Sequence, residues 1–115
     1  MSRSLTREER LRGTAALERI FGSPRKAGCP GAKLFFAENG LSVNRIVISP
    51  VRKFGGAVGR NRARRIGKEV YRNMKSGLKP GFDLAFILFP GDYSYGDRIS
   101  QFSFLLKKAG ILRED

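Results

Sequence analysis

The sequence predicts a mixed α/β domain, a two-layer α+β sandwich with elements in the order α-β-β-α-β-α. The chain has 115 residues, about the size that one hydrophobic core organises. Hydrophobic residues make up 41% and charged residues 29%, which is the globular range. Segments with helical periodicity alternate with short runs typical of strands. No internal repeat or long linker interrupts them, so residues 1–115 are expected to form a single domain.

The first predicted helix lies near the amino terminus. Residues 1–12 are basic and expected to be mobile in part. Thr14 is a suitable N-cap for a helix that runs to about Phe21, because a threonine hydroxyl accepts a hydrogen bond from a free helical N–H. Gly22 is expected to end this helix. The segment 23–31 has two prolines and two glycines, which predicts a loop.

Two strands are predicted to form a hairpin after this loop. Residues 33–37 make the first strand, and Asn39 with Gly40 supplies the positive φ angles of a tight turn. The partner strand lies within residues 41–49, which contain a run rich in β-branched side chains. Pro50 cannot donate a ladder hydrogen bond, so it is expected to end this strand or to lie at a sheet edge.

A long basic helix and a buried strand come next. The helix is predicted over about residues 60–76, with Gly77 just past its end and Pro80 preventing its continuation. Residues 83–89 are almost wholly apolar. Such a run is expected of a central strand that is buried on both faces.

The last predicted helix opens with a capping box. Ser94 and Asp97 have the spacing at which each side chain bonds the backbone N–H of the other. Gly110 is expected to close the helix. Several apolar side chains at helical spacing should face the core. They are Ile99, Phe102, Leu105, Leu106 and Ala109.

Net charge is the unusual property of this composition. Lys and Arg number 23 against 10 Asp and Glu, a formal charge of +13 at pH 7. Residues 45–79 alone hold eleven basic residues and one acid, Glu69. A polyanion is therefore the expected partner. The longest apolar run, 84–89, is far shorter than the ~20 residues that span a bilayer, so no membrane partner is expected.

The side chains of most protein active sites are missing. There is no His, and Cys29 is the single cysteine. Common zinc sites, Ser-His triads and Cys-His pairs therefore cannot be built. The acids Glu38, Asp83, Asp92 and Asp97 lack the spacing of a two-metal nuclease. We predict no catalytic residue and no metal site in this chain, and a lone cysteine suits a reducing cytoplasm.

The basic helix is predicted to have a packed side and a phosphate-facing side. Ala63, Ile66, Val70 and Met74 lie opposite its cations at 100° per residue. A solvated helix face usually mixes charges of both signs, whereas this one has Glu69 as its only acid, so contact with nucleic acid is favoured over a plain solvated face. The polar stripe contains Asn61, Arg65, Lys68, Arg72 and Lys75, with Arg60 and Arg64 beside it.

Aromatic residues favour RNA over DNA as the partner. An exposed ring beside basic residues can stack on an unpaired base. In a chain with nine Phe and no Trp, most phenylalanines must fill the core. Phe21 and one of Phe35 and Phe36 are the better surface candidates, since neighbouring strand residues point to opposite faces.

The segment Lys53–Arg65 resembles the signature of the bacterial ribonuclease P protein component. It holds an Arg-Asn-Arg core followed by two more basic residues, between a strand and a basic helix. The predicted elements are similar to that family over nearly all of residues 5–112. Two positions depart from the pattern: Leu17 stands where the family often has Phe, and Pro50 where the strand usually has a donor.

The resemblance implies a ribonucleoprotein that removes the 5′ leader of precursor tRNA, with a catalytic RNA carrying the chemistry. Mg²⁺ would act through that RNA, and no DNA partner is expected. The resemblance also implies the fold of the second domain of a small-subunit ribosomal protein. That fold has a left-handed β-α-β crossover, against the usual handedness rule.

Two sets of site residues follow from the resemblance and the charged stripe. The set expected to face the catalytic RNA comprises Arg60, Asn61, Arg62, Arg64, Arg65 and, from the stripe, Arg72. The set expected in a cleft for the leader, between the first helix and the sheet, comprises Phe21, Phe36, Arg52, Lys53 and Lys68. Charge alone leaves two other classes open: a structural RNA-binding protein of ribosomal type, and a DNA-binding architectural protein.

Overall fold

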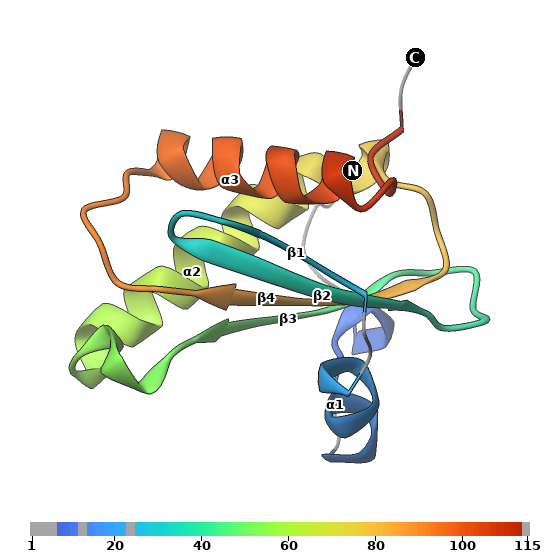
Figure 1. Cartoon of the computed structure of the whole chain (residues 1–115), viewed down its shortest axis with the longest axis horizontal. Helices are drawn as coiled ribbons and strands as arrows, with labels where there is room; N and C mark the ends of the chain where they lie inside the picture. Colours follow the sequence, from blue (N-terminus) through green and yellow to red (C-terminus); the bar gives the residue numbers. More distant parts are fainter. Residues whose placement is uncertain (1–6, 12–13, 23–24, 114–115) are drawn as a thin grey trace.

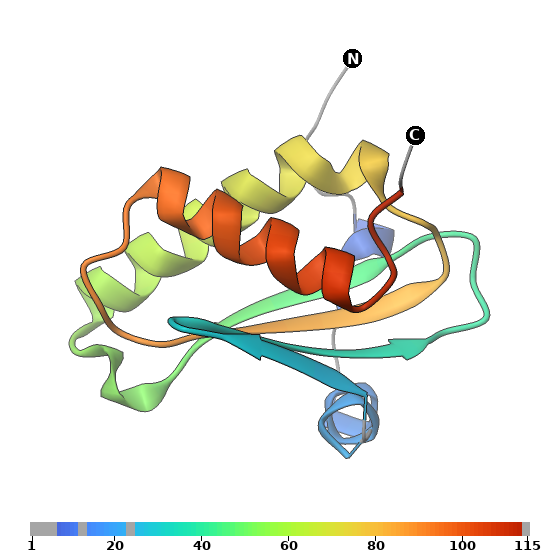
Figure 2. The same ribbon diagram turned by 45° about the horizontal axis from the view of Figure 1, so that its top comes forward.

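A computed structural model describes residues 7–11, 14–22 and 25–113. Its four-stranded sheet has helices α2 and α3 on one face and α1 on the other (Figures 1 and 2). The strands are β1 (Lys26–Cys29), β2 (Ala32–Glu38), β3 (Arg45–Pro50) and β4 (Phe82–Leu88). The helices are α1 (Thr14–Phe21), α2 (Ala57–Met74) and α3 (Tyr95–Lys108), with 3-10 turns η1 (Arg7–Glu9), η2 (Arg52–Phe54) and η3 (Lys75–Gly77).

Strand β4 lies inside the sheet, as its apolar sequence predicts. The strand order is β1-β2-β4-β3, with β4 antiparallel to β2 and parallel to β3. Residues Asp83 to Phe86 are buried, so the prediction of a central strand is confirmed. Helix α2 connects the parallel neighbours β3 and β4, which makes the expected β-α-β crossover.

Strand β1 was not predicted. It lies within residues 23–31, which the composition indicates as a loop, and it makes the element order α-β-β-β-α-β-α. Its four residues pair antiparallel with β2 across a turn in which Gly31 has φ +88°. The β1 sequence lacks β-branched residues, so pairing with β2 rather than local preference makes it a strand.

The predicted hairpin between residues 33–37 and 41–49 is wrong. The Asn39-Gly40 turn exists: Gly40 has φ +72°, and the Asn39 side chain accepts a hydrogen bond from Leu41 N–H at 2.8 Å. The chain after this turn passes to the far side of β4, where β3 forms the edge strand. A turn signature specifies the local bend, whereas the buried apolar strand β4 decides the pairing. Pro50 ends this edge strand, as predicted.

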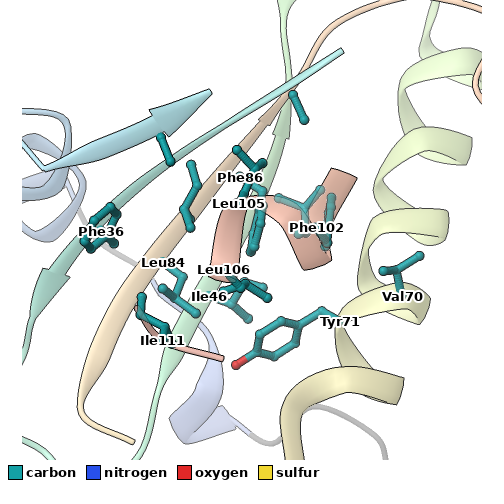
Figure 3. Close-up of a cluster of buried hydrophobic side chains, with 14 of the residues drawn as sticks. Phe36, Ile46, Val70, Tyr71, Leu84, Phe86, Phe102, Leu105, Leu106 and Ile111 are labelled. Carbon is teal, nitrogen blue, oxygen red and sulfur yellow. The ribbon is translucent and has the colours of Figure 1, made fainter. Parts of the chain in front are cut away.

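The main core lies between the sheet and the pair α2 and α3 (Figure 3). Phe86 stacks on Phe102 with ring centroids 4.0 Å apart. Helix α2 approaches β3 so closely that a Cβ at Gly67 would lie 2.8 Å from a methyl of Ile48. Burial raises the pKa of Tyr71, whose ring is enclosed in this core.

Helix α2 spans Ala57–Met74 rather than the predicted residues 60–76, whereas the ends of α3 match the sequence-based expectations. Each partner of the Ser94–Asp97 capping box bonds the other, at 3.1 and 2.8 Å. Gly110 follows α3 with φ +78°, as predicted for its closing residue. The α3 stripe is wrong at one position, because Ile99 is 38% exposed. The predicted cap at Thr14 concerns a side chain outside the described part of the structure.

Candidate RNA-binding surfaces

Helix α2 presents its cations along the side of the molecule beside β3. Asn61, Arg62, Arg65 and Lys68 are exposed, and the other cations of the predicted set are half-buried. Arg64 donates to the Asn61 side chain at 3.0 Å, which fixes both groups on one turn. The buried side of the helix holds Ala63, Gly67, Val70 and Tyr71. The amphipathic pattern therefore separates core from cations as expected.

The cations of this helical segment that have acidic partners in the described ranges lie at the carboxyl-terminal end of α2 and in the adjoining η3. Arg72 pairs with Glu69, and Lys75 pairs with Glu9 of η1 at 3.1 Å. Within the described ranges, no carboxylate lies at ion-pair distance from five cations of the helix. These are Arg60, Arg62, Arg64, Arg65 and Lys68. The unneutralised charge is thus concentrated in the Arg-Asn-Arg half of the helix, where an anionic ligand meets the least competition.

The sheet face that carries α1, here called the α1 face, has an apolar strip across three strands. The register aligns Phe35 of β2, Ala85 of β4 and Val47 of β3. Ala85 is fully buried beneath Ile20 of α1, whereas Phe35 and Val47 are half-buried. Phe21 at the end of α1 is 41% exposed and meets Phe35 edge-on, with centroids 5.3 Å apart. Two adjacent rings thus border the open part of this face.

The next row of the α1 face is more open. Lys33, Ile87 and Ser49 are aligned across β2, β4 and β3, and each keeps partial exposure. The Lys33 ammonium lies 5.9 Å from the centre of the Phe35 ring. A cation and two aromatic rings beside a partly exposed row of strand residues suit a single-stranded nucleic acid, which offers both phosphates and unpaired bases.

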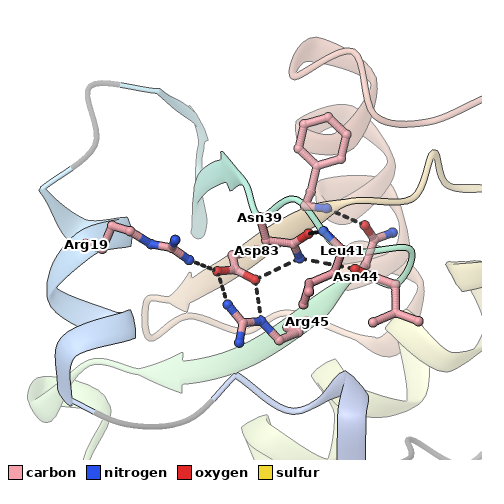
Figure 4. A network of polar contacts seen from close by, with 8 residues as sticks. Arg19, Asn39, Leu41, Asn44, Arg45 and Asp83 are labelled. Carbon is pink, nitrogen blue, oxygen red and sulfur yellow. Dashed lines mark hydrogen bonds and ion pairs between the residues drawn. The ribbon is translucent and has the colours of Figure 1, made fainter.

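A buried carboxylate anchors α1 to the sheet (Figure 4). Asp83 of β4 is fully buried, and Arg45 grips it with two hydrogen bonds of 2.7 Å. Arg19 of α1 forms an ion pair with the same carboxylate, and Asn39 donates to it at 3.0 Å. Burial alone would raise the pKa of Asp83, but these hydrogen bonds and two guanidinium charges outweigh it, so the pKa lies below its ordinary value.

The predicted leader residues do not all lie on the α1 face. Phe36 is only 6% exposed and belongs to the core under α2 and α3, with the Arg25 guanidinium 4.9 Å from its ring centre. The prediction that placed Phe36 in the cleft is therefore wrong, and its neighbour Phe35 takes that place. Because neighbouring strand residues point to opposite faces, only one of Phe35 and Phe36 can lie on the α1 face. The sequence does not indicate which face of the sheet α1 covers.

The predicted basic residues of the leader set have different positions. Lys68 borders a hollow of about 230 Å³ together with Leu11, Val47 and Arg64, at the β3 edge of the α1 face. Lys53 is exposed on η2, just beyond the end of β3. The side chain of Arg52 falls outside the part that the structure describes. Arg10, which bridges to β3 and borders the same hollow, was missed because residues 1–12 gave no periodic signal.

The remaining reactive groups have structural surroundings. Asp97 caps α3, and burial raises the pKa of the Cys29 thiol. Residues 7–11, 14–22 and 25–113 contain no group of three or more metal-ligating side chains that could hold an ion. In the same ranges, none of the helices has the length and apolarity that crossing a membrane requires.

A cationic helix packed on a sheet, with partly exposed aromatic rings on the opposite side of that sheet, defines a small basic RNA-binding α/β protein. The family model for ribonuclease P matches residues 5–110. The chain therefore belongs to the ribonuclease P protein family, which acts in the 5′ processing of tRNA with ribonuclease P RNA as partner.

Individual relatives agree with this assignment. The ribonuclease P protein component of Clostridium botulinum is 42% identical over 81 residues, which cover 68% of this chain and 73% of that protein. The solved ribonuclease P protein of Thermotoga maritima has a TM-score of 0.76 at 28% identity, over 87% of this chain and 96% of that one. A mutant of the Staphylococcus aureus protein has the same fold, with a TM-score of 0.83 at 22% identity and 91% of each chain covered.

Proposed function

We propose that this chain is the accessory subunit of a ribonuclease P whose RNA performs the cleavage. The protein binds that RNA through the amino-terminal half of α2 and binds the 5′ leader of precursor tRNA on the α1 face. The observation that carries the proposal is the run of cations on α2 that have no acidic partner among the described residues. This run lies beside a sheet face with partly exposed aromatic rings.

The α2 surface supports contact with a structured RNA. Arg60, Arg62, Arg64 and Arg65 stand on a rigid helix, so their guanidinium groups can meet successive phosphates without ordering a loop. Phosphate contacts of this kind fix orientation more than they read sequence.

The α1 face supports contact with a single strand. Phe21 and Phe35 offer ring surface to unpaired bases, while Lys33 on one side and Lys68 on the other can neutralise phosphates. The Asp83 ion pairs hold α1 in place over one half of the sheet, so the other half stays open. A leader lying along the open row would be bound with little dependence on its base sequence.

The division of labour follows from what the side chains can do. The described carboxylates cap a helix, pair with an arginine or a lysine, or stand apart, so the described part of the chain offers no cage for a metal ion. Mg²⁺ is therefore assigned to the RNA, and the protein offsets repulsion between RNA backbones. Because its substrate is precursor tRNA, we place the protein in the cytoplasm.

Reconstitution tests this proposal. The purified chain is added to bacterial ribonuclease P RNA and precursor tRNA at low magnesium, and 5′ cleavage is measured against RNA alone. We expect the protein to increase cleavage at low magnesium and to matter less at high magnesium, where cations replace its charge. Site-specific 5′ cleavage by the protein without RNA would contradict the proposal.

A further inference from the structure

A second cavity lies away from the α1 face, between α2 and the connection from β4 to α3. It has a volume of about 380 Å³. Sites for small ligands have volumes of roughly 300 to 1,000 Å³, so this one suits a single small group rather than an extended chain. Its walls include three aromatic rings, two arginines and one acid: Phe54, Tyr93, Tyr95, Arg62, Arg98 and Asp92.

The inner wall of this cavity is rigid. The Tyr93 ring lies against Gly31 and Gly91 so closely that a Cβ at either glycine would approach within 2.5 Å of it. The Arg98 guanidinium covers that ring, 4.7 Å from its centre. Both groups are thus in place before any ligand arrives, which lowers the entropic cost of binding.

Arg98 brings a positive charge to the inner wall of the cavity, where Asp92 is the one lining carboxylate against Arg98 and Arg62. The residue is only 3% exposed, and its guanidinium donates to the carbonyl oxygens of Gly31 and Phe89 and to the Gln101 side chain. All three acceptors are neutral, and no carboxylate of the described chain lies at ion-pair distance from it. Two guanidinium groups against one carboxylate give the lining a net positive charge, which favours a ligand that carries negative charge or carbonyl oxygens.

Tyr95 forms the accessible wall. Its ring is 39% exposed, and its hydroxyl accepts a hydrogen bond from the Asn73 side chain of α2 at 2.9 Å. The ring therefore bridges from α3 to α2 instead of moving freely. The Ser94–Asp97 capping box engages the N–H groups of Ser94 and Asp97 at the start of α3.

We propose that this cavity binds one unstacked nucleotide of the RNA partner, with its base against Tyr95 and its phosphate beside Arg62. This inference rests on the proposed RNA-binding function. Arg62 belongs to the Arg-Asn-Arg segment and lines the cavity, so the RNA that covers α2 passes its mouth. Aromatic walls beside the exposed Arg62 match a base and its phosphate, whereas an apolar peptide segment would give Arg62 no anionic partner.

Two substitutions at one position test the stacking. We expect Tyr95→Ala to weaken binding of ribonuclease P RNA about fivefold or more, as loss of one stacked base implies. Tyr95→Phe should bind nearly as the wild type does, since it keeps the ring. Phe104→Ala is the matched control, because Phe104 is a 50% exposed ring on α3 that does not line the cavity.

The salt dependence separates this inference from the proposed function. Tyr95→Ala should leave the slope of log K against log salt unchanged, because no phosphate contact is removed. A steep wild-type slope with unchanged affinity in Tyr95→Ala would overturn the base site while RNA binding stands. A wild-type slope near zero would instead count against the phosphate-binding helix.

A fluorescent reporter gives a direct readout. The chain has no Trp, so Tyr95→Trp introduces a single indole at the cavity. We expect its emission to be quenched when the RNA binds, with affinity retained, while Phe104→Trp should show no comparable quenching. Equal emission changes for both reporters would overturn the proposal, and circular dichroism checks that each variant is folded.

Discussion

The two faces of the sheet are built from the same strands but differ in what their side chains do. The face under α2 and α3 is covered by two long helices and holds the stacked rings of Phe86 and Phe102. The α1 face is covered by one helix of eight residues, which is held by a small apolar cluster and by the ion pairs of Asp83. Stability is concentrated on the first face, which leaves the second free to keep aromatic and basic groups exposed.

Phe35 and Phe36 are neighbours whose substitution by Ala should have different main effects, on leader binding and on stability respectively. Phe36 is buried in the main core, so Phe36→Ala is expected to lower the free energy of unfolding by about 3 to 5 kcal/mol. Phe35 is half-buried, so Phe35→Ala should cost about 1 kcal/mol in stability and instead weaken leader binding. Urea unfolding and binding of a leader-bearing precursor tRNA measure the two effects. Equal loss of stability in both variants would contradict the division between faces.

Asp83 carries the stability of the α1 face. Asp83→Asn removes the carboxylate that two arginines share, and we expect a loss of about 2 kcal/mol, because both arginines are partly exposed and can be rehydrated. Urea unfolding at neutral pH measures this loss. The apolar contacts of Leu17 and Ile20 would remain. We therefore expect α1 to be held less tightly while the main core stays folded.

The wild type and Asp83→Asn also test how stability depends on pH. The pKa of Asp83 is lowered in the folded state, so its ionised form adds stability at pH values above its ordinary value of 3.8. That contribution is lost progressively as the pH falls below 3.8 and through the folded pKa. The difference in unfolding free energy between wild type and Asp83→Asn should therefore be constant near neutral pH and shrink in acid. A difference that grows in acid would exclude this assignment.

The sequence predicts the elements better than it predicts their partners. The capping box, the basic helix and β4 could be identified because their signals are local: a cap spacing, a helical period and an apolar run. Strand β1 and the position of β3 could not, since both depend on which strand edge is free after β2 and β4 have paired. The same limit explains Phe36, whose face is decided by where α1 docks.

The candidate site was predictable where it lies on one helix. Arg60 to Arg65 could be placed from periodicity and the family signature, because both are properties of a continuous segment. Contacts between distant segments could not be predicted from the sequence. Examples are Arg19 with Asp83, and Tyr93 with Arg98 and Gly31. Nothing in their local sequence indicates these contacts.

Phe21 should show the effect of the α1 face on substrate length. Its ring is 41% exposed at the edge of the open row, so Phe21→Ala is expected to remove about 1 kcal/mol of stacking and little stability. Cleavage of precursor tRNA with several leader nucleotides should suffer more than cleavage of one with one or two. Single-turnover kinetics on a series of leader lengths measures this. An equal loss at every length would place Phe21 outside the leader path.

The smallest expected effect concerns single cations. It tests whether the contribution of a cation to RNA affinity depends on its position or only on its charge. Arg65 is exposed on α2 and has no acidic partner in the described part of the chain, while Lys107 is exposed on α3, away from both proposed RNA surfaces. Each Ala variant removes one positive charge, so a general effect of net charge on RNA affinity would be the same for both.

A phosphate contact contributes about 0.7 to 0.9 to the slope of log K against log salt. Arg65→Ala should therefore flatten the slope by that amount and weaken binding several-fold at low salt, whereas Lys107→Ala should leave the slope as it is. The slope is obtained from RNA binding titrations between about 50 and 200 mM salt, the range over which such contacts are resolved. If both variants flatten the slope equally, the RNA is attracted by the total charge of the protein and α2 has no special position in the complex.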